Sequence, residues 1–181
     1  MVSPEKLAEI KEFILPRKFV EEICALEPPK NEPKYIGAWE CPSFRYLLKE
    51  DSQFSLWGLP KPTENRFHVF SLAPYIGTIK IKGPIGRIQD RHGWATMHGT
   101  SFGNEIFFVK QYSLESLKNG GRQSPMLYHG TKEFGNFGEK DEYISGLITN
   151  LDEEPSAPLP FLMTDTWSHH RLITKNYLPV E

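Results

Sequence analysis

The sequence predicts an all-β protein with short N-terminal helices, built on an antiparallel sheet that forms either a sandwich or a barrel. From Lys34 onward, short segments rich in β-branched and aromatic residues are separated by Gly, Pro, Asn or Asp at close intervals. This texture is typical of antiparallel strands joined by turns. No strand segment alternates with a ten-residue helical pattern, as a parallel α/β sheet would require. Helical periodicity lies only in the N-terminal part of the chain.

Two short helices are expected before the first strand. Ser3 is a good N-cap and Pro4 suits the first helical position, and apolar residues then recur along one face, so we expect a helix over 4–14. A proline ends this helix, and apolar residues at mixed three- and four-residue spacings predict a second short helix around 19–24. We expect this helical segment, 1–29, to flank or plug the sheet that follows.

The remainder is expected to be the sheet region, 34–175, of a single domain that covers residues 1–181. Glycines and prolines punctuate it without a low-complexity tract, so no linker is predicted. The stretch SFGNE predicts a hairpin turn in which Gly103-Asn104 supplies the positive φ angles. The acidic, proline-rich loop 150–160 is expected either to act as a lid or to be solvated. The expected strands lie near 34–41, 44–49, 53–59, 66–73, 76–83, 92–100, 104–113, 123–130, 142–149, 159–165 and 169–175.

Composition and charge argue against several partners. The 181 residues are 39% hydrophobic and 13% aromatic, and the net charge is −2 with acidic and basic residues spread evenly. Without a basic stripe, nucleic acid is not an expected partner. No apolar run is long enough to span a membrane, and the N-terminus has no apolar signal region. Cys24 and Cys41 make neither a disulfide framework nor a zinc pattern, so we expect a cytoplasmic protein with reduced cysteines.

Three stretches of the chain, which together cover roughly residues 34–150, resemble the calycin, or lipocalin-like, β-barrel family. KYIGAWE contains the Gly-x-Trp that opens the first strand of such barrels, and MLYHGT and EYISGLIT resemble two later strands. Leu147 stands where that strand often has Trp. The longest stretch has an Asp before a glycine, a second glycine, a tight turn and a strand reading Phe-x-Lys-x-Tyr. These places are occupied by Asp90, Gly93, Gly99, Phe108, Lys110 and Tyr112. The resemblance implies an antiparallel lipocalin-like barrel, closed at one end by Trp39 stacked on Arg171.

Candidate site residues follow from the alternation of side chains along the predicted strands. Phe108, Lys110 and Tyr112 share one strand face. If that face is interior, Lys110 is desolvated, which lowers its pKa and suits it to act as a base or to pair with a carboxylate or a ligand. Two alternatives remain: Lys110 closes a barrel end as structure, or the face points outward, with Phe107, Val109 and Gln111 as the lining. The predicted ligand-binding residues are Phe108, Lys110, Tyr112, Tyr128, Met97 and Ala95, and Lys110 and Tyr128 are catalytic candidates if the protein is an enzyme.

The tripeptide His-Gly-Thr occurs twice, beginning at His98 and at His129. In two-histidine phosphoesterases, paired His-x-Thr motifs on neighbouring strands act as general acid and base. Those enzymes carry the motifs in two repeated lobes, and the short spacing here leaves no room for a repeat. We therefore interpret both triplets as strand ends that need a glycine, and keep the phosphoesterase as a minor alternative.

The resemblance favours a protein that binds a small, largely apolar molecule in a barrel cavity. The alternatives are a cofactor-free isomerase, cyclase or dehydratase acting on an apolar molecule in such a barrel, and a protein-interaction module. No cofactor and no metal site are predicted, because neither cysteine nor carboxylate lies at a ligand spacing beside the candidate histidines. These are His68, His92, His169 and His170.

Overall fold

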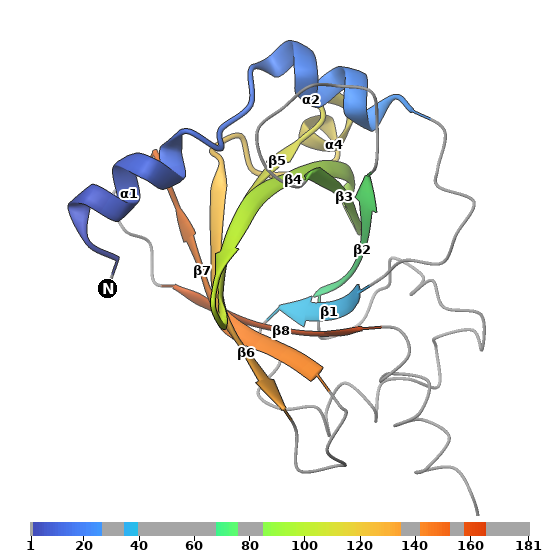
Figure 1. Cartoon of the computed structure of the whole chain (residues 1–181). Helices are drawn as coiled ribbons and strands as arrows, with labels where there is room; N and C mark the ends of the chain where they lie inside the picture. The colour runs from blue at the N-terminus through green and yellow to red at the C-terminus, as the bar shows by residue number, and fades with distance from the viewer. Residues whose placement is uncertain are drawn as a thin grey trace, which may run out of the picture.

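The computed structural model of the chain describes residues 2–26, 35–39, 68–75, 85–134, 142–152 and 158–165. In these residues, eight strands follow one another in antiparallel order and close into a barrel, because β1 pairs with β8 from Tyr35↔Asp165 to Trp39↔Phe161 (Figure 1). The strands are β1 (Tyr35–Trp39), β2 (His68–Tyr75), β3 (Ile85–Asp90), β4 (Gly93–Phe102), β5 (Glu105–Tyr112), β6 (Met126–Phe134), β7 (Glu142–Asn150) and β8 (Leu159–Asp165). The predicted antiparallel barrel with short N-terminal helices is confirmed, and this closure excludes the sandwich.

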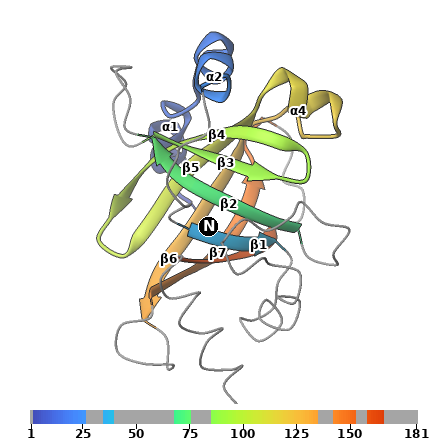
Figure 2. The ribbon, with the colours of Figure 1, turned by 90° about the vertical axis from the view of Figure 1, so that its right-hand side faces the viewer.

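Within the described part of the chain, three short helices lie outside the ring of strands: α1 (Pro4–Lys11), α2 (Arg17–Cys24) and α4 (Leu114–Lys118). The Ser3 hydroxyl caps α1 by accepting a hydrogen bond from the amide of Lys6 at 3.3 Å. The structure ends α1 at Lys11 rather than at residue 14, because the amides of Phe13 and Ile14 bond the carbonyls three residues back, at 2.9 and 3.1 Å, in place of the i−4 bonds of an α-helix. α1 packs on β5 and α2 on β4, while α2 and α4 lie near one end of the barrel (Figure 2).

Side chains alternate between the barrel interior and its outer face. On β5, Phe108 and Tyr112 belong to the interior, whereas Phe107 and Val109 pack against Ile10 of α1 on the outside. A second outer group, around Val20 of α2, covers β3. We call the buried apolar residues inside the barrel the interior cluster. Its members are Ile88, Ala95, Met97, Phe108, Tyr112, Met126, Tyr128, Ile144, Ile148, Phe161 and Met163.

Polar side chains on the outer face fasten the N-terminal segment to the barrel. The amide group of Gln111 bonds both backbone groups of Leu15, accepting from its N–H at 2.7 Å and donating to its carbonyl at 3.0 Å. Arg87 donates to the carbonyl of Leu26 just beyond α2, at 2.7 Å, and stacks on Trp94 with 4.4 Å between its guanidinium carbon and the ring centroid. These contacts satisfy backbone groups of the segments on either side of α2.

Two elements were not expected from the sequence. β3 was missed because the glycines and proline at 83–86 resemble a turn, although Ile85, Arg87 and the residues that follow pair with both β2 and β4. α4 was missed because five residues are too few for a periodic pattern, but its cap is readable: the Ser113 hydroxyl accepts from the amide of Ser116 at 3.2 Å. The hairpin turn at Gly103 is as predicted, with φ of 59° between β4 and β5.

Several expectations lie outside the described residues. These are the strands near 44–49, 53–59, 76–83 and 169–175, Cys41, His169, His170, Arg171, the side chains of Trp39 and His68, and residues 153–157 of the loop 150–160. Over the ranges given above, no helix has the length and apolar character needed to cross a membrane.

Candidate functional site

A buried polar cluster lies inside the barrel and consists of Asp90, Lys110 and Tyr112. Lys110 Nζ forms an ion pair with Asp90 Oδ2 and donates to the Tyr112 hydroxyl at 2.8 Å. The Tyr112 hydroxyl in turn donates to Asp90 Oδ2 at 2.7 Å. Asp90 Oδ2 therefore accepts a hydrogen bond from both Lys110 and Tyr112. With the bond from Lys110 to Tyr112, the three side chains form a closed ring of hydrogen bonds.

The register of three strands explains why these side chains meet. Asp90 ends β3 and Tyr112 ends β5, and the two strands are separated by β4. The inward positions of β4 at this level are Gly93, opposite Asp90, and Ala95, opposite Tyr112. Ala95 is small, so side chains from β3 and β5 can meet across β4 at its level. The space at Gly93 is taken by α4 instead, because an added Cβ there would lie 2.6 Å from Ser116 Oγ.

Burial dominates the electrostatics of the cluster. The side chains of Lys110 and Asp90 are 0% and 1% exposed. Burial lowers the pKa of Lys110 to about 8, and the charge and hydrogen bond of Asp90 oppose this shift. Burial, and then the charge of Asp90, raise the pKa of Tyr112 well above its ordinary value, so the phenol stays protonated and serves as a donor. Asp90 Oδ1 also accepts from the backbone amide of His92 at 2.8 Å, which fixes the carboxylate.

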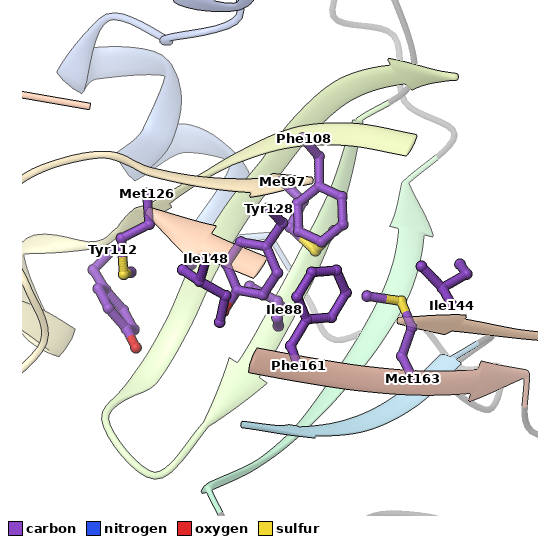
Figure 3. Packing of buried hydrophobic residues seen from close by; sticks show 11 residues of the cluster. Ile88, Met97, Phe108, Tyr112, Met126, Tyr128, Ile144, Ile148, Phe161 and Met163 are labelled. Atoms are coloured by element: carbon purple, nitrogen blue, oxygen red, sulfur yellow. The ribbon is translucent and has the colours of Figure 1, made fainter. Parts of the chain in front are cut away.

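The rest of the described interior is apolar, aromatic and rich in sulfur. Phe108 and Tyr128 stack with their ring centroids 4.5 Å apart, and Tyr128 contacts Phe161 at 5.0 Å. Figure 3 shows Tyr112 and Met126 at one side of the interior cluster and Met163 at the other. The sequence has four methionines, and the three that follow the first residue all belong to this cluster. Methionine side chains adapt their shape easily.

The structure brings together the six residues predicted to bind a ligand. Lys110 is fully buried beside Tyr112, and the others belong to the interior cluster: Ala95, Met97, Phe108, Tyr112 and Tyr128. The alternative lining lies on the outer face, where Phe107 and Val109 pack under α1 and Gln111 holds Leu15. The role of the six in binding stays a prediction.

Sequence reasoning missed the role of Asp90, which entered only as a position in the family pattern. The signal that identifies it is the small residue Ala95, which pairs with Ile88 of β3 and with Tyr112 of β5. Asp90 is two residues beyond Ile88 and Lys110 two residues before Tyr112, so the two side chains can form an ion pair across Ala95. Recognising this needs the pairing of β3 with β4, and β3 was itself missed.

The two His-Gly-Thr triplets lie apart from the polar cluster, with both histidines on the outer face. His98 Nδ1 is 3.0 Å from the carbonyl oxygen of Phe13, after α1, and its ring meets the Phe13 ring edge-on at 4.9 Å. His129 stacks on Phe107 at 4.3 Å and lies 3.3 Å from Glu105 Oε1. Each histidine thus has a partner that serves the packing of the outer face.

The interpretation of the triplets as strand ends is wrong in one respect. Gly99 lies inside β4 and Gly130 inside β6, because both strands continue for several residues beyond them. A Cβ at Gly99 would lie 2.0 Å from the carbonyl oxygen of Phe107, and one at Gly130 would lie 2.9 Å from Phe161 and Ile144. Glycine is needed at both positions because residues of the adjacent strands come too close to leave room for a Cβ. This use of glycine is typical of strand interiors.

Of the histidines considered for a metal site, His92 is within the described residues with its side chain. Its Nδ1 lies 2.9 Å from the carbonyl oxygen of Asn119, and its Nε2 accepts from Arg91 at 3.1 Å. Where side chains are described, no group of three or more His, Cys, Asp or Glu residues is placed to hold a metal ion. The thiol of Cys24 is free, and burial raises its pKa to about 12, which makes it a poor nucleophile.

Compared with models of known families, with curated proteins and with solved structures, the chain gives no significant match. The geometry of the barrel interior is therefore the basis for assigning a function.

Proposed function

We propose that the barrel binds a small, largely apolar molecule in its interior, with a polar group of that molecule directed at the cluster of Asp90, Lys110 and Tyr112. The observation that carries the proposal is this buried polar cluster set into an otherwise apolar wall. A small-molecule site typically combines such a wall with a few polar groups that fix orientation. The closed antiparallel barrel also supports our placing the chain among the lipocalin-like proteins, many of which enclose one small ligand.

The energetics of the ion pair support a role beyond stability. Removing a lysine and a carboxylate from water costs several kcal/mol per ion, and replacing such a pair by apolar residues of similar volume is often neutral or stabilising by roughly 1–4 kcal/mol. Lys110 and Asp90 are nevertheless kept at 0% and 1% side-chain exposure. A ligand-orienting role gives a reason for retaining charges where an apolar core would fold at least as well.

The methionines support the same proposal. Met97, Met126 and Met163 belong to the interior cluster together with stacked aromatic rings. Unbranched thioether side chains repack around guests of different shape at low cost, and they are frequent on binding surfaces that adapt to their ligands. An interior rich in them can make room for an apolar molecule by rotamer changes.

Native mass spectrometry of the purified chain tests the proposal. We expect a bound mass that is lost after organic extraction, and saturable binding of the neutral fluorescent probe N-phenyl-1-naphthylamine to the extracted protein. Ala95→Phe fills the interior beside Tyr112 and should abolish probe binding, whereas the matched outer-face variant His129→Gln should bind as the wild type does. Absence of both a bound mass and saturable probe binding would overturn the proposal.

One observation favours catalysis as a second candidate. The buried amine of Lys110 has its pKa lowered to about 8, so a fraction is neutral and can act as a base near neutral pH. With Tyr128 nearby in the interior cluster, this suits a cofactor-free isomerase, cyclase or dehydratase. Lys110→Met separates the two candidates, because it should abolish turnover by an enzyme but change the affinity of a binder by about one to a few kcal/mol.

A further inference from the structure

We infer that the ligand, if the barrel binds one as proposed above, is an electrically neutral apolar alcohol rather than a carboxylate such as a fatty-acid anion. Two properties of the polar cluster lead to this inference: its net charge, and the kind of hydrogen bond that Asp90 and Tyr112 leave open. Each property follows from contacts of described residues.

The net charge of the cluster is zero, because the cation of Lys110 is balanced by the carboxylate of Asp90 in direct contact. Arg87 is also buried, but it points outward, toward the end of α2 and the ring of Trp94. Among the described side chains, the interior therefore has no cation in excess. An arriving carboxylate would lose its hydration and be repelled by Asp90, without an uncompensated positive charge to offset these costs.

On Asp90 and Tyr112, the positions that can still form a hydrogen bond are acceptors. The Tyr112 hydroxyl donates its single proton to Asp90 Oδ2 and accepts one bond from Lys110 Nζ, so one of its two lone pairs is left. Asp90 accepts from Lys110, Tyr112 and the amide of His92, and as a carboxylate it offers acceptor sites alone. A ligand that meets these oxygens has to supply a donor.

A hydroxyl group meets both conditions. It donates one hydrogen bond, carries no charge, and leaves the ion pair intact. A ketone lacks the donor, and a carboxylate lacks the donor and adds a charge. For molecules of equal chain length, we therefore expect the affinity to fall from the alcohol to the ketone to the carboxylate.

Competition for N-phenyl-1-naphthylamine bound to the intact chain at neutral pH tests this order. The competitors are 1-decanol, 2-decanone and decanoate, which have the same number of carbon atoms. We expect decanol to displace the probe at a concentration at least about tenfold lower than decanoate, the size of one lost polar contact. Equal or stronger displacement by decanoate would overturn the inference and leave the proposed binding function standing. Failure of the probe to bind at all would overturn both.

The variant Asp90→Asn makes the test specific to the cluster. It removes the balancing carboxylate, whose charge and hydrogen bond also oppose the lowering of the pKa of Lys110. The competition on this variant is therefore run at about pH 6, to favour the protonated amine, and the preference should move toward decanoate by about tenfold or more. The double variant Asp90→Asn/Lys110→Met removes both charges and should return the preference to decanol. An unchanged preference in Asp90→Asn, with the fold verified by circular dichroism, would refute the charge argument. If Asp90→Asn does not fold, the wild type alone tests the inference, through the ratio of the concentrations at which decanol and decanoate displace the probe.

Discussion

Replacing Gly99 by alanine tests the close approach of β4 and β5, on which the shape of the barrel depends. An added Cβ would lie 2.0 Å from the carbonyl oxygen of Phe107 and 2.5 Å from the Cα of Phe108, whereas ordinary contact begins at 3.4 Å. Both obstacles are backbone atoms of the paired strand, so no side-chain rotation relieves them. The two strands have to separate locally by roughly 1 Å, which takes the adjoining ladder bonds out of hydrogen-bond range.

The expected cost of Gly99→Ala is large relative to the stability of a domain. Overpacking contributes about 1–3 kcal/mol. Two weakened ladder bonds add about 1 kcal/mol each. The free energy of unfolding should fall by about 3–5 kcal/mol, out of a typical total of about 5–15 kcal/mol. At about 2–4 °C per kcal/mol for a chain of this size, Tm falls by roughly 10 °C. Urea unfolding followed by tryptophan fluorescence, together with thermal unfolding, measures both quantities.

Gly103→Ala is the matched control. Gly103 has φ of 59° in the hairpin turn, and nothing lies within 4 Å of an added Cβ. Its cost is the backbone penalty of a left-handed residue, about 1–2 kcal/mol. Gly146→Ala repeats the main test on β7, because its Cβ would lie 2.0 Å from the carbonyl oxygen of His129. If Gly99→Ala loses no more stability than Gly103→Ala, the close approach of β4 and β5 does not exist.

Three further predictions concern the outer face and the ion pair. Gln111→Leu removes both hydrogen bonds to Leu15 and should lower the free energy of unfolding, measured by urea titration, by about 2–4 kcal/mol. Hydrogen exchange at the Leu15 amide should become faster. Unchanged exchange there would show that Gln111 does not hold the N-terminal segment on the barrel. In the folded protein, burial lowers the pKa of Lys110 from its ordinary 10.5 to about 8. The cost of burying the charged amine is therefore absent above pH 10.5 and grows as the pH falls to 8. The free energy of unfolding of the wild type, measured relative to Lys110→Met, should therefore rise between pH 8 and 10, by up to roughly 3 kcal/mol, and a flat difference would show that Lys110 is not desolvated. His129→Gln loses only a half-exposed stacking contact with Phe107, so the free energy of unfolding should change by less than about 1 kcal/mol. If His129→Gln and His98→Gln each lowered a catalytic activity by several orders of magnitude, the phosphoesterase alternative would be restored.

Local features of the chain could be predicted because their causes lie within a few residues. The alternation of β5 depends on the two-residue period of a strand, so Phe108, Lys110 and Tyr112 had to share a face wherever the strand was placed. The turn at Gly103 depends on glycine's freedom to adopt positive φ, and the start of α1 on the Ser3 cap. The many short strands in turn limited the fold to a sandwich or a barrel.

Tertiary structure alone decided which side of β5 is interior and what meets there. Asp90 and Lys110 are 20 residues apart, and they form an ion pair because the register of β3, β4 and β5 places them diagonally on either side of the small residue Ala95. Closure of the barrel depends on the pairing of β1 with β8, and the covering of its outer face depends on where α1 and α2 pack. A local pattern sets which residues share a face. Register and packing depend on contacts between distant segments, and these determine what each face touches.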